Sequence, residues 1–136
     1  MPTVLVSAGV AGVLFVLLDL AWFSVSREWL YNPELGALLR AKVGVAAAAG
    51  FYAVYALGMA VLVIAPSAAL GDAQRALFHG AALGVTAYAT YNLTNLATLR
   101  GWSALVTFGD LAWGTFATAV VCWTTTMAVM KFSPAS

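Results

Sequence analysis

Four apolar segments, each long enough to cross a lipid bilayer, constrain this chain more than any other feature. A transmembrane helix needs about 20 consecutive apolar residues. The sequence therefore predicts spans over residues 4–25, 43–65, 76–99 and 104–130. Residues 32–42 are predicted either as an interfacial helix or as an extension of the second span. We expect one domain over residues 1–136, folded as an all-α, integral membrane, four-helix up-and-down bundle.

The composition agrees with a lipid environment and excludes several classes of protein. Hydrophobic residues make up 63% of the chain and charged residues only 8%, whereas a soluble domain carries about 25% charged residues. The net charge of +1 excludes a nucleic-acid partner, because phosphate binding needs clustered Lys and Arg. The single Cys122 cannot form an intramolecular disulfide, and no Cys/His spacing typical of a metal site occurs. We expect neither a metal nor a cofactor.

Polar and helix-breaking residues predict the helix ends. Asp72 and Ser103 are expected to cap the third and fourth helices. Asn32 and Pro33 read as the N-cap and first residue of the second helix, which would separate it from the first. Pro66 is expected to end the second helix.

The distribution of basic residues predicts the orientation. One side of the predicted bundle holds Arg27, Arg40, Lys42 and Arg100, and the other holds Arg75 and Lys131. Because cytoplasmic loops carry the excess of Lys and Arg, both termini are expected outside the cytoplasm.

Polar residues inside the spans point to a site. Asp19 and Asp110 each lie within an apolar span, and the third span carries Asn92 and Asn95. Ionisable groups in hydrocarbon are costly, and those present usually face a bundle interior or a water-filled cavity and mark function. At 1.5 Å per residue, all four side chains fall within about 6–11 Å of one membrane face. We predict a polar pocket in that leaflet, in which two neighbouring carboxylates cannot both ionise cheaply.

Aromatic residues at helical spacing complete the predicted pocket. The tetrapeptide Asp-Leu-Ala-Trp occurs at 19–22 and again at 110–113, so each aspartate shares a helix face with a tryptophan. Two tyrosines of the third span share a face with the asparagines, and two of the second span lie nearer mid-membrane. The predicted ligand-binding residues are Asp19, Asp110, Asn92, Asn95, Tyr91, Trp22, Trp113, Tyr88, Tyr52 and Tyr55.

A purely structural interpretation stays open. Polar side chains in membrane helices also tie neighbouring helices together by hydrogen bonds. Gly80 and Gly84 form a GxxxG pattern, which favours close helix packing and, less strongly, dimerisation. Thr124 to Thr126 are expected to bond their own helix backbone.

The sequence also resembles a known family. The residues that carry the resemblance are the run from Tyr88 to Trp102 (YATYNLTNLATLRGW), the two Asp-Leu-Ala-Trp motifs, and Phe51 to Tyr55 (FYAVY). They are similar to the domain-of-unknown-function family numbered 2177, which comprises small bacterial membrane proteins. The resemblance implies four helices in a bacterial inner (plasma) membrane, and it supplies no activity and no catalytic residues. It also implies that Asp is common where Asn92 stands.

Three functions remain open at this point. In a small-solute transporter, Asp19 and Asp110 bind a proton or cation, Asn92, Asn95 and Tyr91 contact the solute, and a homodimer is expected because four helices are few. In a membrane-embedded enzyme or its accessory, acting on a lipid or hydrophobic substrate, one aspartate is a general base and the other a neutral acid. In a structural subunit of a membrane assembly, the polar residues hold helices together. Membrane lipid is a partner in all three.

Overall fold

The structure is a computed structural model that describes residues 2–132, so residue 1 and residues 133–136 of the predicted domain lie outside the described residues. Residues 2–132 contain no strand. The α-helices are α1 (Pro2–Ser26), α2 (Asn32–Leu35), α3 (Val45–Met59), α4 (Ala65–Ala69), α5 (Ala73–Thr98) and α6 (Ala104–Phe132). Helical turns of other types join α1 to α2 and α3 to α4, so the chain forms four long helical units.

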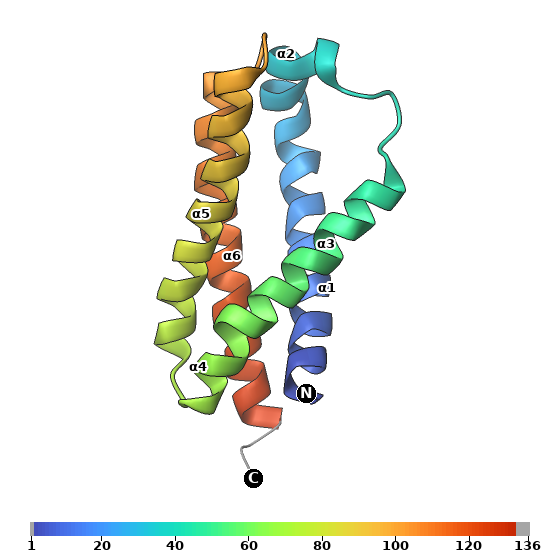
Figure 1. The fold of residues 1–136 in the computed structure, drawn as a ribbon. Coiled ribbons are helices and arrows are strands. Elements are labelled where there is room, and N and C mark those ends of the chain that lie inside the picture. Colours follow the sequence, from blue (N-terminus) through green and yellow to red (C-terminus); the bar gives the residue numbers. More distant parts are fainter. Residues whose placement is uncertain (1, 133–136) are drawn as a thin grey trace.

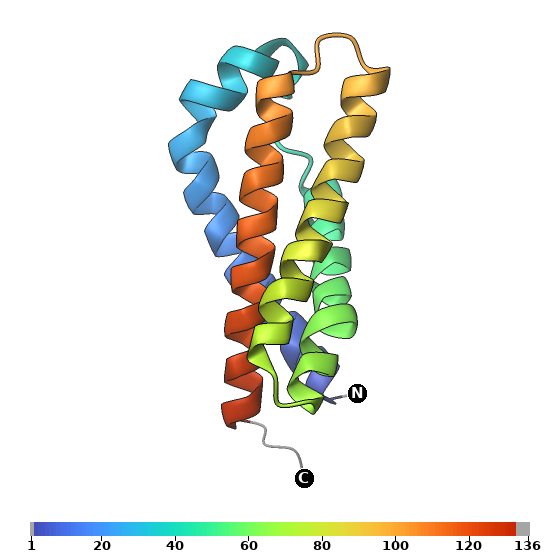
Figure 2. The same ribbon diagram turned by 90° about the vertical axis from the view of Figure 1, so that its left-hand side faces the viewer.

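The four units run alternately up and down (Figure 1). α1, α5 and α6 run the length of the molecule, and α3 crosses them at a tilt, with the N-terminus and the end of α6 at the same end of the bundle. α5 and α6 lie side by side (Figure 2) and make the most extensive contact between any two helices. The predicted all-α, up-and-down four-helix fold is confirmed.

The helices have the length and surface of a membrane protein. Three units are long and apolar enough to cross a membrane, Pro2–Leu38, Val45–Ala69 and Ala104–Phe132. α5 has 26 residues, about 39 Å of helix, but its polar side chains keep it outside that group. Large apolar side chains such as Val13, Val54 and Phe116 are more than half exposed, as expected where lipid takes the place of water.

Residues 32–38 do not extend the second span, which is one of the two alternatives predicted for residues 32–42. They continue the first helix, and the irregular segment 39–44 then leads to α3. The connection is a π-helical turn at Arg27–Tyr31, in which the Asn32 N–H bonds the carbonyl of Arg27, five residues back. Asn32 and Pro33 therefore lie inside a continuous helix and do not begin a new one.

Pro66 likewise fails to end its helix, and for the same reason. A π-helical turn at Ala60–Ile64 precedes it, and the Ala65 N–H bonds the carbonyl of Ala60. Pro33 and Pro66 each stand two residues after such a turn. Proline cannot donate an N–H, and its ring clashes with the carbonyl four residues back. The wider turn places that carbonyl elsewhere, so the helix passes through the proline.

The GxxxG pattern of α5 packs against α6. A Cβ at Gly80 would lie 2.9 Å from Cβ of Cys122, and a Cβ at Gly84 would lie 2.6 Å from the carbonyl oxygen of Gly114. These contacts explain how α5 and α6 approach so closely, and they satisfy the packing interpretation of the motif. The predicted caps of these helices are also confirmed: Asp72 Oδ1 accepts the Arg75 N–H at 2.9 Å, and Ser103 Oγ accepts the Val106 N–H at 3.1 Å.

Candidate functional site

Asp19 lies in the bundle interior and accepts hydrogen bonds from two other helices. Its side chain is 4% exposed. Tyr52 Oη of α3 donates to Oδ2 at 2.8 Å, and Trp113 Nε1 of α6 donates to Oδ1 at 2.8 Å. The carboxylate of α1 therefore connects α3 with α6.

Asp110 is held in the same way from two other elements. Tyr31 Oη, from the π-helical turn after α1, donates to Oδ1. Asn92 Nδ2 of α5 donates to Oδ2 at 3.1 Å and also bonds the carbonyl of Tyr88 at 3.0 Å. Asn92 is fully buried. The carboxylate of α6 thus connects α5 with the top of the first helical unit.

Stacked indoles connect the two carboxylates. The rings of Trp22 and Trp113 stack with centroids 5.0 Å apart and planes inclined by 7°. Trp113 donates directly to Asp19, whereas Trp22 Nε1 donates to Tyr31 Oη at 3.0 Å, and Tyr31 donates to Asp110. Each tryptophan therefore serves the aspartate of the other helix, one directly and one through a tyrosine. We call this set the carboxylate network; its members are Asp19, Asp110, Trp22, Trp113, Tyr31, Tyr52 and Asn92.

Tyr31 is the member that sequence reasoning missed. Its position after a polar stretch predicts an interfacial aromatic, but its side chain is 7% exposed. The π-helical turn redirects this part of the helix over the end of α6, where Leu30, Leu35 and Val106 form a small apolar cluster with Tyr31. A π-helical turn leaves no clear pattern in one sequence, although such turns are frequent at functional sites.

The remaining predicted residues divide into two groups. Tyr55 is buried and shares a hydrogen bond of 2.7 Å with Thr118, and the Tyr88 ring covers Gly114 so closely that no Cβ would fit there. Both lie next to the carboxylate network. Tyr91 is 55% exposed and packs edge-on against Trp102, and Asn95 is half-buried. The helical face predicted from spacing is therefore split, with Asn92 turned inward and Tyr91 outward.

The electrostatics of the carboxylate network are unusual for buried acids. Every side-chain hydrogen bond that the described residues make to the two carboxylates comes from a neutral donor. Buried charges are normally paired with an opposite charge or with a metal ion. Asn92 Oδ1 is also buried and has no hydrogen-bond partner within residues 2–132. The site thus holds two acids and one free acceptor, with no compensating cation from the described part of the chain.

The space around the network differs from the predicted open pocket. A groove of about 420 Å³ lies between α1 and α3, lined by small and apolar side chains that include Gly9, Gly12 and Ala53. Tyr52 is the one member of the carboxylate network that lines this groove. This groove does not join the two aspartates. They are connected instead by the stacked indoles and the hydrogen bonds described above.

Comparison with known proteins assigns the family. The family model described as "Predicted membrane protein (DUF2177)" matches residues 4–127, which contain every member of the carboxylate network. The chain belongs to the DUF2177 family. This membership confirms the resemblance drawn from the motifs around Asp19, Tyr88 and Asp110. The family description and the long apolar helices identify an integral membrane protein. No curated protein and no solved structure matches the chain. The activity is therefore inferred from the site.

Proposed function

We propose that the chain is a small proton-coupled membrane transport protein in which Asp19 and Asp110 bind the proton. The observation that carries the proposal is that the buried Asp19 and the partly buried Asp110 share one network and receive only neutral donors from the described residues. Two such groups in low dielectric cannot both carry a full charge cheaply. Binding a proton at one of the two carboxylates removes that cost, and releasing the proton restores it, which is the property a coupling site needs.

A proton fits this site better than a metal cation. All four carboxylate oxygens already accept an O–H or N–H group, and a metal ion would have to displace these donors. A carboxyl group that binds a proton gains an O–H, which needs one acceptor. The Oδ1 atom of Asn92 has no partner among the described residues, and rotation of the amide would turn it toward the protonated Asp110. The Tyr31 hydroxyl can both donate and accept hydrogen bonds. It can therefore donate to the ionised carboxylate of Asp110 and accept from the protonated carboxyl group.

The solute would meet the protein on the accessible side of α5. Tyr91 and Asn95 lie there, outside the hydrogen bonds of the carboxylate network. They remain our proposed solute contacts, with Trp22 and Trp113 as the wall behind them. Because four helices enclose little space, the proposal includes a homodimer, which chemical cross-linking in membranes would detect as a discrete two-subunit band.

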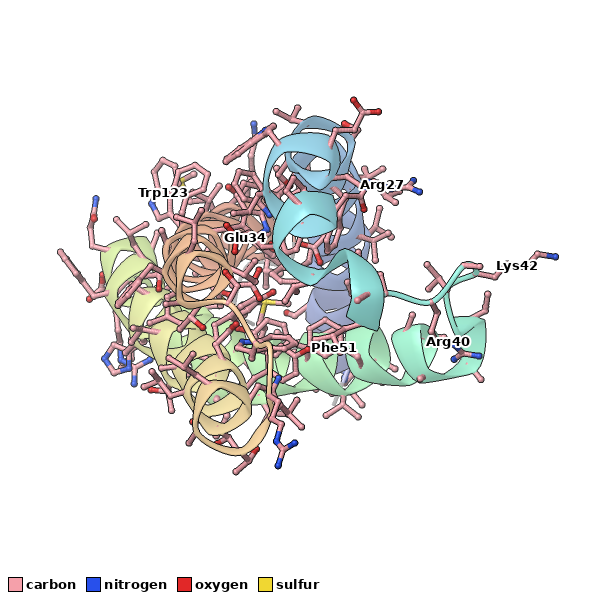
Figure 3. The ribbon with its side chains drawn as sticks, turned by 90° about the horizontal axis from the view of Figure 1, so that it is seen from above. Arg27, Glu34, Arg40, Lys42, Phe51 and Trp123 are labelled. Carbon is pink, nitrogen blue, oxygen red and sulfur yellow. The ribbon has the colours of Figure 1, made fainter. Side chains whose placement is uncertain are left out.

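The orientation is proposed from charge. Arg27, Arg40 and Lys42 project at the end of the bundle away from the termini (Figure 3), and Arg100 lies in the connection between α5 and α6 at that end. Since cytoplasmic loops carry the excess of Lys and Arg, we place this end in the cytoplasm of a bacterium and both termini outside. Protease cleavage of a C-terminal tag in intact spheroplasts tests the placement; a tag protected until lysis contradicts it.

Proton flux into liposomes tests the proposed function. The purified chain is reconstituted with a trapped pH-sensitive dye, and a potassium diffusion potential drives proton entry. We expect faster acidification than in empty liposomes, and a rate close to that of empty liposomes for Asp110→Asn. A melting temperature of Asp110→Asn close to that of the unmodified chain shows that folding is intact. Flux that is unchanged in this variant removes the proposal and favours the structural role.

The groove between α1 and α3 favours a second function, binding of a lipid acyl chain. It is lined by small and apolar side chains, faces the surface where lipid lies, and reaches Tyr52, which bonds Asp19. Ala53→Trp would fill the groove, whereas Val54→Trp adds the same ring at a position 72% exposed. Native mass spectrometry should show less retained lipid for the first variant alone. Equal retention in both variants removes this function.

A further inference from the structure

One stripe of positions, which begins at the Ser103 cap and continues along α6, carries only small or polar residues beside the buried Val106, Val121 and Val129. Its positions, spaced three or four residues apart, are Ser103, Thr107, Asp110, Gly114, Thr118, Cys122 and Thr125. All are buried except Asp110, which is partly buried. The inward face of a bundle helix normally carries Leu, Ile or Val, and on α6 the buried valines lie beside this stripe. The stripe extends over about 33 Å of helix, which matches the hydrocarbon thickness of about 30 Å.

The upper part of this stripe is hydrogen-bonded. Ser103 donates to Glu34, the carboxylate labelled near the centre of Figure 3, at 2.8 Å. Thr107 donates to the carbonyl of Ser103 at 2.9 Å, and Thr118 shares its bond with Tyr55. These groups and the carboxylate network lead from the end away from the termini to about the middle of the bundle.

Towards the end of the bundle where the termini lie, three hydroxyl groups of α1 and α6 have no partners among the described residues. Ser7, Thr125 and Thr126 are each 0% exposed, and their hydroxyl oxygens have no hydrogen-bond partner within the described residues. A buried hydroxyl that is left unpaired destabilises the folded state, because it has lost its hydrogen bonds to water. Thr107 and Thr115 avoid this cost by bonding their own helix backbone. Thr125 and Thr126 make no such bond, so the prediction that they bond their own helix backbone is wrong.

Helix register brings Ser7 to the level of Thr125. The hydrogen bond between Asp19 and Trp113 fixes how the antiparallel helices α1 and α6 lie against each other. Ser7 and Thr125 are each twelve residues beyond that bond, about 18 Å further along their helices. Thr126 is the next residue of α6. The three hydroxyls therefore form one layer near the end where the termini lie.

We propose that Ser7, Thr125 and Thr126 bind internal water, and that this layer gives the carboxylate network proton access to the membrane face at which the termini lie. Buried water typically makes about three hydrogen bonds to polar groups that would otherwise be unpaired, and this layer offers three. The inference rests on the proposed function and deepens it by naming the route along which the coupled proton reaches the carboxylate network. Each water or hydroxyl in the path accepts one proton and releases one, so only O–H bonds form and break.

Cys122 lies between the two parts of the path and can report on it. It is fully buried, one helical turn from Thr125 and Thr126, and is the only cysteine of the chain. The S–H stretching vibration is resolved from other protein bands in the infrared, and the band shifts when deuterium replaces the proton. Exchange therefore measures whether water reaches this depth.

The test is infrared exchange of the full chain in lipid vesicles moved into D₂O. We expect the Cys122 S–H band to exchange in the unmodified chain and in Thr115→Val, whose hydroxyl is already bonded to its helix. In Ser7→Ala combined with Thr125→Val and Thr126→Val, exchange should slow by about tenfold or more, because it then requires local opening. If the triple variant does not fold, Thr125→Val alone is compared with Thr125→Ser, which should restore fast exchange.

Two outcomes overturn the inference. The first is a Cys122 S–H band that does not exchange with deuterium in the unmodified chain. The second is an equal exchange rate in the unmodified chain and in the triple variant. The proposed function fails separately. If exchange behaves as expected but the aspartate variants keep full proton flux, the water layer stands and the proton coupling does not.

Discussion

The rings of Trp22 and Trp113 stack with their centroids 5.0 Å apart, and their indole N–H groups donate to Tyr31 and to Asp19, respectively. The two Asp-Leu-Ala-Trp motifs therefore interlock between antiparallel helices. Trp113 reaches Asp19 directly, and Trp22 reaches Asp110 through the hydroxyl of Tyr31. This relationship makes one unit of two acids that lie 91 residues apart in the chain.

Removing the indole N–H of Trp113 should destabilise the bundle. Trp113→Phe keeps an aromatic ring in the stack but leaves Asp19 Oδ1 without its donor. We expect a loss of about 1–3 kcal/mol in the free energy of unfolding, the cost of an unpaired buried polar group. Denaturation in detergent measures it, with Trp29→Phe as the control because Trp29 is 59% exposed. Equal losses in both variants contradict the assigned hydrogen bond.

Tyr31 and Asp110 should be energetically coupled. Residues in one hydrogen-bond network show interaction energies of about 0.5–3 kcal/mol in double-mutant cycles. We expect a value in that range for Tyr31→Phe with Asp110→Asn. For Tyr91→Phe with Asp110→Asn we expect additivity, since Tyr91 packs on Trp102 instead. Additivity in the first cycle shows that the Tyr31 hydroxyl does not act on Asp110.

Close packing between α5 and α6 should make Gly114 intolerant of a side chain. Its missing Cβ leaves the space that the Tyr88 ring occupies, so Gly114→Ala should cost about 1–3 kcal/mol of unfolding free energy by overpacking. Gly50→Ala is the matched control. Gly50 has no atom within 4 Å of its built Cβ, and alanine should stabilise that helix position by about 0.5–1 kcal/mol. Similar melting temperatures for both variants contradict the packing.

A carboxylate at position 92 should make the stability of the protein depend on pH. Asn92 Nδ2 donates to two acceptors, the Tyr88 carbonyl and Asp110. In Asn92→Asp the protonated side chain can still donate one hydrogen bond. The ionised side chain has no donor, and it places a negative charge next to the Tyr88 carbonyl and the Asp110 carboxylate. The melting temperature of this variant, relative to the unmodified chain, should therefore fall as pH rises. Asn95→Asp, half-buried and outside the network, should show a smaller slope, and equal slopes contradict the assigned contacts.

Apolar periodicity and single polar residues were enough to predict much of this fold. The four long helical units, the caps at Asp72 and Ser103 and the up-and-down order all follow from local sequence. Asp19, Asp110 and Asn92 belong to one hydrogen-bonded and stacked network, and their similar depth follows from the sequence because position along a helix converts directly into position across the bundle.

Local sequence does not predict the path of the chain at the two prolines or the burial of the tyrosines. Proline normally interrupts a helix. At Pro33 and Pro66 the preceding π-helical turns let the helices continue. That extra width also turns Tyr31 inward, which no helical spacing predicts. Tyr91 shares its sequence face with Asn92, but the position of α6 against α5 decides which of them is buried.

The most direct test of the account is whether Asp19 and Asp110 act as one proton-binding unit. Proton flux into liposomes is compared for Asp19→Asn, Asp110→Asn and the double variant, with Glu28→Gln, an exposed acid, as the control. Residues that act as a unit show non-additive losses, so each single variant should lose as much flux as the double variant while Glu28→Gln keeps the full rate. If either single aspartate variant transports protons at the rate of the unmodified chain, the two carboxylates do not form the coupling site.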